Sequence, residues 1–515
     1  MPSSALNSPV QPGPASAAGR RTRPGVTLAI MLCAQLMIVL DLSVVNIALP
    51  SIETGLHFTA ASLSWVLNAY ALTFGGLLLL GGRAGDILGR RRVFLAGLAL
   101  FTAASLAGGL ATSSGWLLAA RAVQGVGGAI ATPAVLALIV SGFPEGRERT
   151  RALGMFTAVA MGGGSLGLVL GGVITEWFSW RWVLFINVPI GIAVLLFGPR
   201  FIPESDRQPG RLDLGGALTS TAGMGALVYG FIRAASNGWS DSLTLAAFAA
   251  AVLLLAAFLV IETRTAQPIT PLRLFTDRSR AASYLVRLLV VAGMFGMFFF
   301  LTQFVQDVLG LSPLLAGLAF VPMTAALFAV SRLAPVLLPR FGAKPLMVVG
   351  LIPAVAGMAW LGQISASSTY LSGVLGPMLL LGAGMGVAFV PLTMTSLAGV
   401  SPADSGAAAS MVNVTQQVGG ALGLSILVTV FGTASRSAAR HPLAHASAVA
   451  QAHHILTHGM SVAFTVAAVF DLCALLVVVL AIRAARPQPS PVPAPDPVTP
   501  QITAEIADAN ADSLI

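Results

Sequence analysis

The sequence predicts an all-α polytopic membrane protein with fourteen transmembrane helices, arranged as two pseudo-symmetric six-helix halves plus an inserted central helix pair. Composition is the first reason: of 515 residues, 56% are hydrophobic and 9% are charged, whereas a soluble domain carries roughly 25% charged residues. Apolar runs of about 20 residues recur along the chain, and each can cross a bilayer as a helix. Basic residues gather in alternate loops. Together these features exclude a soluble enzyme, a disordered protein and a secreted disulfide scaffold.

Each apolar run predicts one helix, because backbone polar groups in lipid must bond to one another. The polar tails at 1–25 and 484–515 are rich in Pro, and the second is also acidic, so we expect both to be disordered. The first run is longer than a signal-peptide core and contains Asp41, so cleavage is not expected. The expected spans are 26–50, 62–82, 93–110, 116–138, 152–174, 182–200, 213–233, 242–262, 283–306, 314–337, 345–365, 371–397, 407–432 and 460–482.

The basic residues predict the orientation of these helices. Of the 28 Lys and Arg residues, 22 fall in the two tails and one set of loops, which the positive-inside rule places in the cytoplasm with both termini. The net charge of +9 is therefore a topology signal, and no nucleic-acid partner is expected. Arg is used almost to the exclusion of Lys, which is typical of a GC-rich bacterial genome and favours a bacterial plasma (inner) membrane.

Weak internal symmetry divides the chain into units. The loop at 86–91 aligns with 339–344 at an offset of 253, and the segment 128–133 resembles 386–391 at an offset of 258. Repeats of this kind are typical of secondary transporters. The predicted units are an N-terminal half at 26–200, an inserted hairpin with its flanking loops at 201–282, and a C-terminal half at 283–483.

Three ionisable residues, Asp41, Arg121 and Asp471, lie away from the ends of the predicted spans, where a charge costs about 2.5–3.5 kcal/mol or more and indicates function. Glu262 and Arg287 lie close to span ends, where their charges can reach the membrane surface. Asp41 can exchange a proton or face a cationic substrate, or it can be a structural partner of a helix end. Arg121 shares a helix face with Gln124 and can either act on a nearby carboxylate or bond backbone carbonyls. Asp471 can be a second proton or substrate carboxylate, or a polar contact between helices.

Other small and polar residues predict helix contacts and a cavity. The span at 152–174 carries a glycine ridge that permits close helix packing, namely Gly163, Gly167, Gly171 and Gly172. The candidate cavity-lining residues are polar side chains within apolar spans, namely Gln124, Gln303, Gln306, Asn413, Gln417 and Asp471.

Catalysis, cofactors and metals are not expected. The chain has no Walker phosphate loop, so an ATP-driven pump is not encoded, and neither a nucleophile elbow nor a zinc-binding HExxH helix occurs. Five of the six histidines fall in the loop near 433–459, but no Cys or carboxylate joins them, which favours a solvated loop over a metal site. Cys33 and Cys473 lie in apolar runs and are expected to be buried free thiols.

Four stretches together resemble the major facilitator superfamily, in its fourteen-helix drug:proton antiporter branch, and the resemblance extends over residues 26–483. They are 82–92 (GRAGDILGRRR), 40–50 (LDLSVVNIALP), 121–125 (RAVQG) and 180–191 (WRWVLFINVPIG). The resemblance implies proton coupling at Asp41 and Arg121. It also implies an inner-loop gate formed by Gly82, Asp86, Gly89, Arg90 and Arg91.

One departure concerns the fifth helix, where the family motif has Gly-Pro before its final Gly-Gly. Here Gly167 is followed by Leu168, so the helix lacks the bend that proline would introduce. The sequence nevertheless predicts a multidrug efflux transporter that exports amphipathic or hydrophobic small molecules by proton antiport, as a monomer in the lipid bilayer. The alternatives are a transporter of the same fold, exporter or importer, for one narrow metabolite or lipid, and a transport-dead membrane sensor or scaffold.

Overall fold

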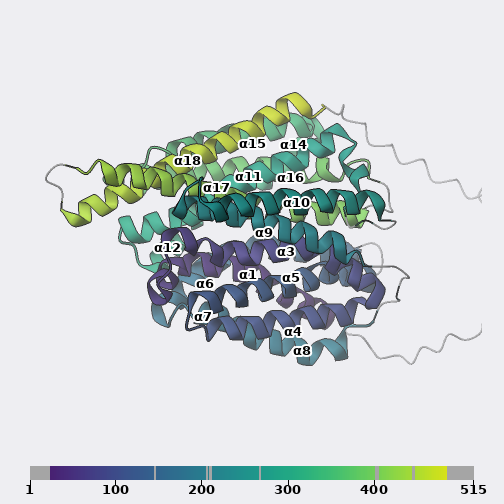
Figure 1. Ribbon diagram of the computed structural model, residues 1–515. Coiled ribbons are helices and arrows are strands. Elements are labelled where there is room, and N and C mark those ends of the chain that lie inside the picture. The colour runs from purple at the N-terminus through teal and green to yellow at the C-terminus, as the bar shows by residue number, and fades with distance from the viewer. Residues whose placement is uncertain are drawn as a thin grey trace, which may run out of the picture.

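The computed structural model describes residues 24–143, 147–204, 207, 212–265, 268, 270–400, 405–443 and 447–483. The predicted tails at 1–25 and 484–515 therefore lie outside the described residues, except that Pro24 and Gly25 already belong to the first helix. In the described part of the chain, regular structure is entirely helical, and the long helices run side by side (Figure 1).

The first eight helices pack together and account for the first six predicted spans. The sixth span is a short helix, α7, followed by a longer one, α8. Three of these helices, α1, α5 and α8, surround the polar cluster described below. The helices are α1 (Pro24–Leu56), α2 (Ala60–Leu63), α3 (Trp65–Leu88), α4 (Arg90–Gly109), α5 (Ser114–Gly142), α6 (Arg147–Trp177), α7 (Trp182–Phe185) and α8 (Asn187–Phe201).

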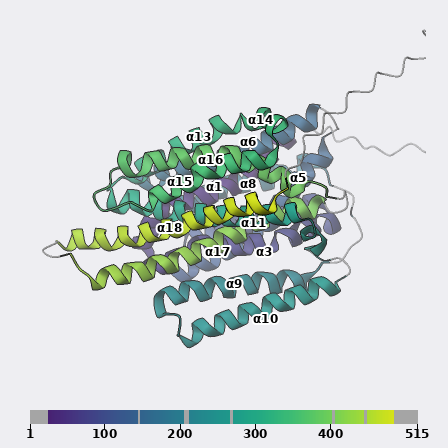
Figure 2. The same cartoon turned by 90° about the horizontal axis from the view of Figure 1, so that it is seen from above.

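Two helices follow at the side of the bundle, α9 (Leu214–Asn237) and α10 (Ser242–Arg264). Figure 2 shows this pair along one edge of the molecule, and α9 packs against both α3 and α17 (Ser405–Arg440). Asp213 and Asp241 cap the two helices by accepting hydrogen bonds from backbone N–H groups in the first turn, which satisfies donors that a helix start leaves free.

The remaining helices form the other side of the bundle, and α17 and α18 extend beyond the rest at the left of Figure 1. The tenth span is broken into three helices, and π-helical turns interrupt the ninth and twelfth spans. The elements are η1 (Leu272–Phe275), α11 (Arg278–Gln303), η2 (Phe304–Val308), α12 (Pro313–Ala319), α13 (Val321–Ser331), α14 (Ala334–Phe341), α15 (Ala343–Leu361), η3 (Tyr370–Leu375), α16 (Gly376–Leu397), α17 and α18 (Ala448–Ala481).

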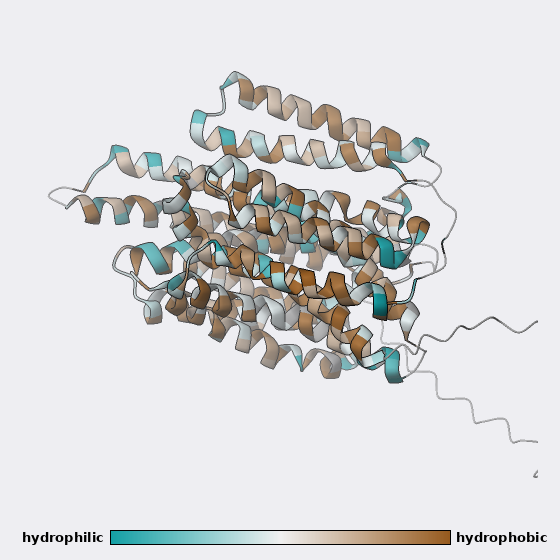
Figure 3. Ribbon diagram, turned by 90° about the horizontal axis from the view of Figure 1, so that it is seen from below, coloured by the Kyte–Doolittle hydropathy of each residue, from teal (hydrophilic) through white to brown (hydrophobic). Residues whose placement is uncertain are grey.

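Among the described residues, twelve helical segments are long and apolar enough to cross a membrane. Figure 3 shows hydrophobic residues along the lengths of the helices and hydrophilic residues mainly near their ends. Because the outer face of such a bundle meets lipid, apolar side chains on that face are not covered by other parts of the protein. The prediction of two buried thiols is wrong for this reason: Cys33 is exposed and Cys473 is half-buried.

The two loops that the sequence aligned share an unusual backbone conformation. Gly89 has a φ of 104° between α3 and α4, and Gly342 has a φ of 79° between α14 and α15. Only glycine adopts this region readily, so each loop reverses the chain within one residue. We call the end of the bundle that holds these turns, the start of α1 and the end of α18 the basic-loop end.

Candidate functional site

A buried ion pair joins α1 to α5. Nη1 of Arg121 lies 2.5 Å from Oδ2 of Asp41, and each residue is 1% exposed. The two residues are 80 positions apart in sequence. An ion pair taken out of water is tolerated only when its remaining hydrogen-bonding capacity is also satisfied, so the neighbours of the pair decide its properties.

Three polar side chains complete what we call the Asp41 cluster (Asp41, Ser105, Arg121, Gln124 and Asn187). Oδ1 of Asp41 accepts hydrogen bonds from Nε2 of Gln124 at 2.7 Å and from Nδ2 of Asn187 at 2.8 Å. Gln124 also accepts from Arg121 at 2.6 Å and donates to the Ser105 hydroxyl at 2.8 Å. The carboxylate is therefore held directly from α5 and α8, and Ser105 of α4 binds the amide groups of Gln124 and Asn187 that hold it.

Arg121 has two further contacts outside this cluster. Its Nε donates to the backbone oxygen of Val66 at 3.1 Å, and its guanidinium lies over the Tyr70 ring, 4.5 Å from the centroid. Its Nη2 is buried without a partner among the described residues. Both alternatives for Arg121 are thus present together, because the side chain binds a carboxylate and a backbone carbonyl at once.

The sequence placed two members of this cluster incompletely. Gln124 was expected to line a cavity, but it is 1% exposed and forms its hydrogen bonds with other members of the cluster. Asn187 was assigned no role, although it binds Asp41 directly. An amide side chain at the start of an otherwise apolar run, two residues before Pro189, was the signal that pointed to it.

The predicted inner-loop gate ties four helices together at the basic-loop end. Arg90 binds Asp86 through its Nε at 3.2 Å and its Nη2 at 3.0 Å, and it also donates to the backbone oxygen of Ala137 on α5 at 3.4 Å. Arg91 donates to the backbone oxygen of Ile202, just after α8, at 3.2 Å. Gly82 lies where an added Cβ would meet Pro133 at 3.5 Å, an ordinary contact.

Glu204 belongs to this gate and was not predicted. Its Oε1 accepts a hydrogen bond from the backbone N–H of Arg91 at 3.0 Å, and its Oε2 lies 3.6 Å from Nε of both Arg91 and Arg92. A Cβ added at Gly89 would lie 2.9 Å from Oε1 of Glu204. Gly89 is thus needed both for its backbone conformation and for the close approach of this carboxylate.

The glycine ridge of α6 packs against two helices. Cβ atoms added at Gly163, Gly167 and Gly171 would meet α1, including the Ser43 hydroxyl and the backbone of Val44. A Cβ at Gly172 would lie 2.5 Å from the backbone oxygen of Pro313, at the start of α12. Three glycines therefore permit close packing on α1 and the fourth permits close packing on α12.

The candidate cavity-lining residues do not form one group. Gln303 donates to its own helix at Phe299, and Gln306 donates to the backbone oxygen of Ile47 on α1 at 2.9 Å. Asn413 is exposed, and Gln417 is buried against Gly75 of α3. Of the six residues, only Asp471 lines one of the cavities described below.

Solved structures with the same arrangement of helices show the fold. A peptide transporter of the POT family aligns with a TM-score of 0.63 at 16% identity, covering 91% of this chain and 99% of that one. A bacterial homologue of the human lysosomal transporter Spinster aligns with a TM-score of 0.61 at 17% identity, covering 92% and 100%. The fold and its apolar helices define a polytopic helical membrane protein.

The particular family follows from sequence comparison. The model of the Major Facilitator Superfamily matches residues 31–424, and the chain belongs to this family. It is 44% identical to the cephamycin export protein CmcT of Amycolatopsis lactamdurans over 81% of this chain and 88% of that protein. It is also 43% identical to the puromycin resistance protein pur8 of Streptomyces alboniger over 85% and 88%.

Proposed function

We propose that this protein exports antibiotic-like amphipathic or hydrophobic small molecules across a bacterial plasma membrane in exchange for protons. The Asp41 cluster carries this proposal, because a fully buried carboxylate beside a fixed guanidinium is a group whose protonation changes the charge of the bundle interior. The names of the relatives, an export protein for cephamycin and a resistance protein for puromycin, support the choice of cargo.

In the proposed topology fourteen helices cross the membrane, and α9 and α10 are the inserted pair. Twelve segments meet the length and hydropathy needed for crossing. The other two are α6, with 31 residues, and α9, with 24, which pack along the length of α1 and α10 respectively. At about 1.5 Å per residue both exceed the ~30 Å bilayer core. An even number of crossings puts both termini on the basic-loop side, which the positive-inside rule assigns to the cytoplasm.

The proton-binding group and the contact between the two halves lie on one helix. Asn46, five residues after Asp41, accepts a hydrogen bond from the Thr302 hydroxyl of α11 at 2.7 Å, and Ile47 accepts one from Gln306. On the proposed mechanism, a proton from outside neutralises Asp41 and releases Arg121. The cluster then rearranges, and α1 transmits the change to its contacts with α11 and η2. One chain contains both halves, so a monomer suffices.

The test is substrate-driven proton flux in everted membrane vesicles, followed with a pH-sensitive dye and a panel of amphipathic antibiotics. Addition of a transported compound should collapse the proton gradient. Asp41→Asn and Arg121→Ala should abolish the collapse, whereas Asp241→Asn, at the half-buried N-cap of α10 and outside the cluster, should leave it intact. Unchanged coupling in both cluster variants would refute the proposal.

A further inference from the structure

Asp471 is a buried carboxylate whose surroundings differ from those of Asp41. Asp471, on α18, is 0% exposed, and neither of its carboxylate oxygens has a hydrogen-bond partner in the described part of the chain. A buried polar group without a partner is rare in native structures and calls for an explanation. Asp41, by contrast, has a guanidinium and two amide groups bound to it.

The side chain of Asp471 borders a cavity of about 20 Å³, and roughly 10–15 Å³ is enough to admit one water molecule. Its other walls come from α11, α13, α15 and α16 and are apolar. Thioether side chains dominate them, namely Met294, Met297, Met323, Met358 and Met385. Methionine is flexible enough to let such a cavity change shape.

No other titratable or charged group among the described residues reaches this carboxylate. On α11 the nearest is Arg287, seven residues before Met294 and so about 10 Å away along the helix, where it donates to the Thr393 hydroxyl of α16 at 2.6 Å. On α15, Lys344 donates to the backbone oxygen of Val479, eight residues beyond Asp471. The basic residues of α17, Arg436 and Arg440, lie near the opposite end of the bundle, where Arg436 donates to the backbone oxygen of Ala235 on α9.

An ionised carboxylate in this position would be an unpaired charge in an apolar setting, which costs several kcal/mol even after relaxation. The neutral acid avoids most of that cost. In the arrangement described here, Asp471 therefore carries its proton. It can lose that proton only when water or a cation reaches it.

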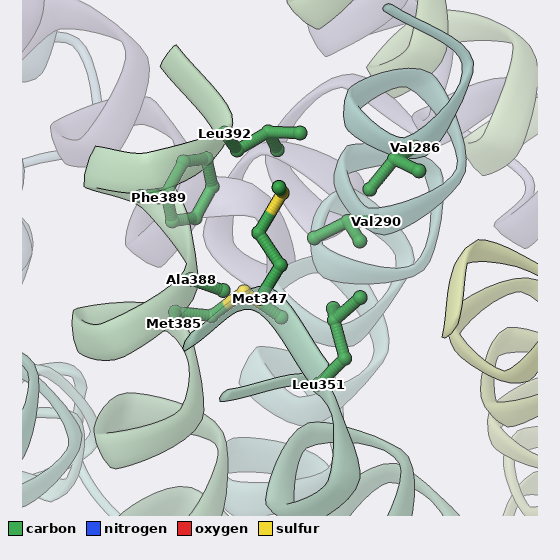
Figure 4. Close-up of a pocket in the computed structure, with 8 residues that line it drawn as sticks. All are labelled: Val286, Val290, Met347, Leu351, Met385, Ala388, Phe389 and Leu392. Carbon is green, nitrogen blue, oxygen red and sulfur yellow. The ribbon is translucent and has the colours of Figure 1, made fainter. Parts of the chain in front are cut away.

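A further small cavity lies beside it, on the side of the basic-loop end. A second cavity, of about 10 Å³, shares Val290 and Met385 with the first and extends toward Leu392 (Figure 4). Figure 4 shows the side chains of Met347 and Met385 between the surrounding helices. The start of α11 and the end of α16 belong to the basic-loop end, so the two cavities are stacked between that end and Asp471. The side chains of Val290 and Met385 line both cavities, so their movement is the step we expect to connect them with water.

The two halves therefore place their buried carboxylates differently. At the offset of 253 that relates the halves, Asp41 corresponds to Met294, a wall of the Asp471 cavity. The helices around this cavity, α11, α15, α16 and α18, correspond in order to α1, α4, α5 and α8, which hold the Asp41 cluster. Equivalent interiors thus hold a carboxylate bound to arginine in one half and a carboxylate bound to nothing in the other.

We infer that Asp471 is a second proton-binding group of the transport cycle. It holds a proton while the C-terminal half is closed and releases it toward the basic-loop end when the two cavities become hydrated. The inference rests on the proposed proton antiport and adds a second proton per substrate to the one assigned to Asp41. Since each proton supplies about 2.3 kcal/mol per 100 mV of membrane potential, losing one would lower the maximal substrate gradient roughly 50-fold per 100 mV.

The experiment measures the ratio of proton flux to substrate flux for the full chain in proteoliposomes, with a pH dye inside and a labelled antibiotic of neutral charge. Asp471→Asn mimics the protonated acid and should halve the ratio, whereas Asp471→Glu should restore it. Asp241→Asn is the matched control and should leave the ratio unchanged. If wild-type protein shows no substrate-driven proton flux, the proposed function itself fails.

An unchanged ratio in Asp471→Asn, with normal substrate flux, would overturn the inference and leave Asp471 a structural residue. Selective loss of cationic but not neutral substrates would also overturn it, in favour of a substrate site. If Asp471→Asn does not fold, infrared spectroscopy of Asp41→Asn protein decides. The carbonyl band of a protonated carboxyl group should be present at neutral pH, and a spectrum without that band at neutral pH would refute the inference.

Discussion

Replacing Arg121 with methionine should destabilise the protein by about 3 kcal/mol, because removing one partner of a buried ion pair typically costs ~3–5 kcal/mol. The substitution removes the contact at 2.5 Å with Asp41 and the hydrogen bond at 3.1 Å to Val66. Gln124 and Asn187 still bind the carboxylate, which places the expected cost at the lower end of that range.

A double-mutant cycle tests this reasoning. Asp41→Asn alone leaves a buried unpaired cation and should cost a similar amount, whereas the double variant Asp41→Asn/Arg121→Met contains no buried charge. Its loss should therefore be about 3 kcal/mol less than the sum of the two single losses. The assay is denaturant-induced unfolding in detergent micelles, followed by tryptophan fluorescence. Additive losses would show that the two residues do not stabilise one another and would refute the assignment.

Three further predictions concern other parts of the structure. Gly172→Val should push α6 away from α12 and abolish antibiotic export in intact cells, because an added Cβ would lie 2.5 Å from the α12 backbone. Gly25→Val is the control and should be tolerated, because nothing lies within 4 Å of a Cβ added at Gly25. Gly89→Ala should lower unfolding stability by about 1–2 kcal/mol, since φ is 104° and Glu204 lies 2.9 Å from the new Cβ; an unchanged melting temperature would contradict this. The hydrogen bond from Arg233, and to a smaller extent that from the backbone N–H of Thr244, lowers the pKa of Asp241 from 3.8 to about 2. The ionised carboxylate therefore contributes fully to stability above pH 3.8, and this contribution is lost only as the pH falls through about 2. Asp241→Asn should therefore leave the pH profile of transport between pH 5 and 8 unchanged, and a shifted profile would show that this pair takes part in coupling.

The sequence determined that the chain is a membrane protein and where most of its helices lie. Hydropathy and helix length are local properties that depend on consecutive residues alone. Twelve helical segments of the described residues are accordingly long and apolar enough to cross a membrane, and the two further spans stay a prediction. The motifs also sufficed to identify the family, because each of them, such as the loop at 82–92 and the segment 121–125, is a short run of consecutive residues. The same local reasoning could not foresee the breaks in the span at 314–337, where the chain turns at Phe320 and Arg332 between three short helices.

The tertiary structure alone decided which buried groups meet. Asp41 and Asn187 are 146 residues apart, and their contact depends on the depth and rotation of α1 and α8 in the bundle, which no local pattern fixes. Glu204 reaches the gate for the same reason. Asp471 shows the converse, since its sequence setting resembles that of Asp41 but packing gives its carboxylate no hydrogen-bond partner among the described residues. A charged residue within an apolar span is visible in the sequence. Whether that charge is paired depends on which side chains of other helices lie at the same depth in the bundle.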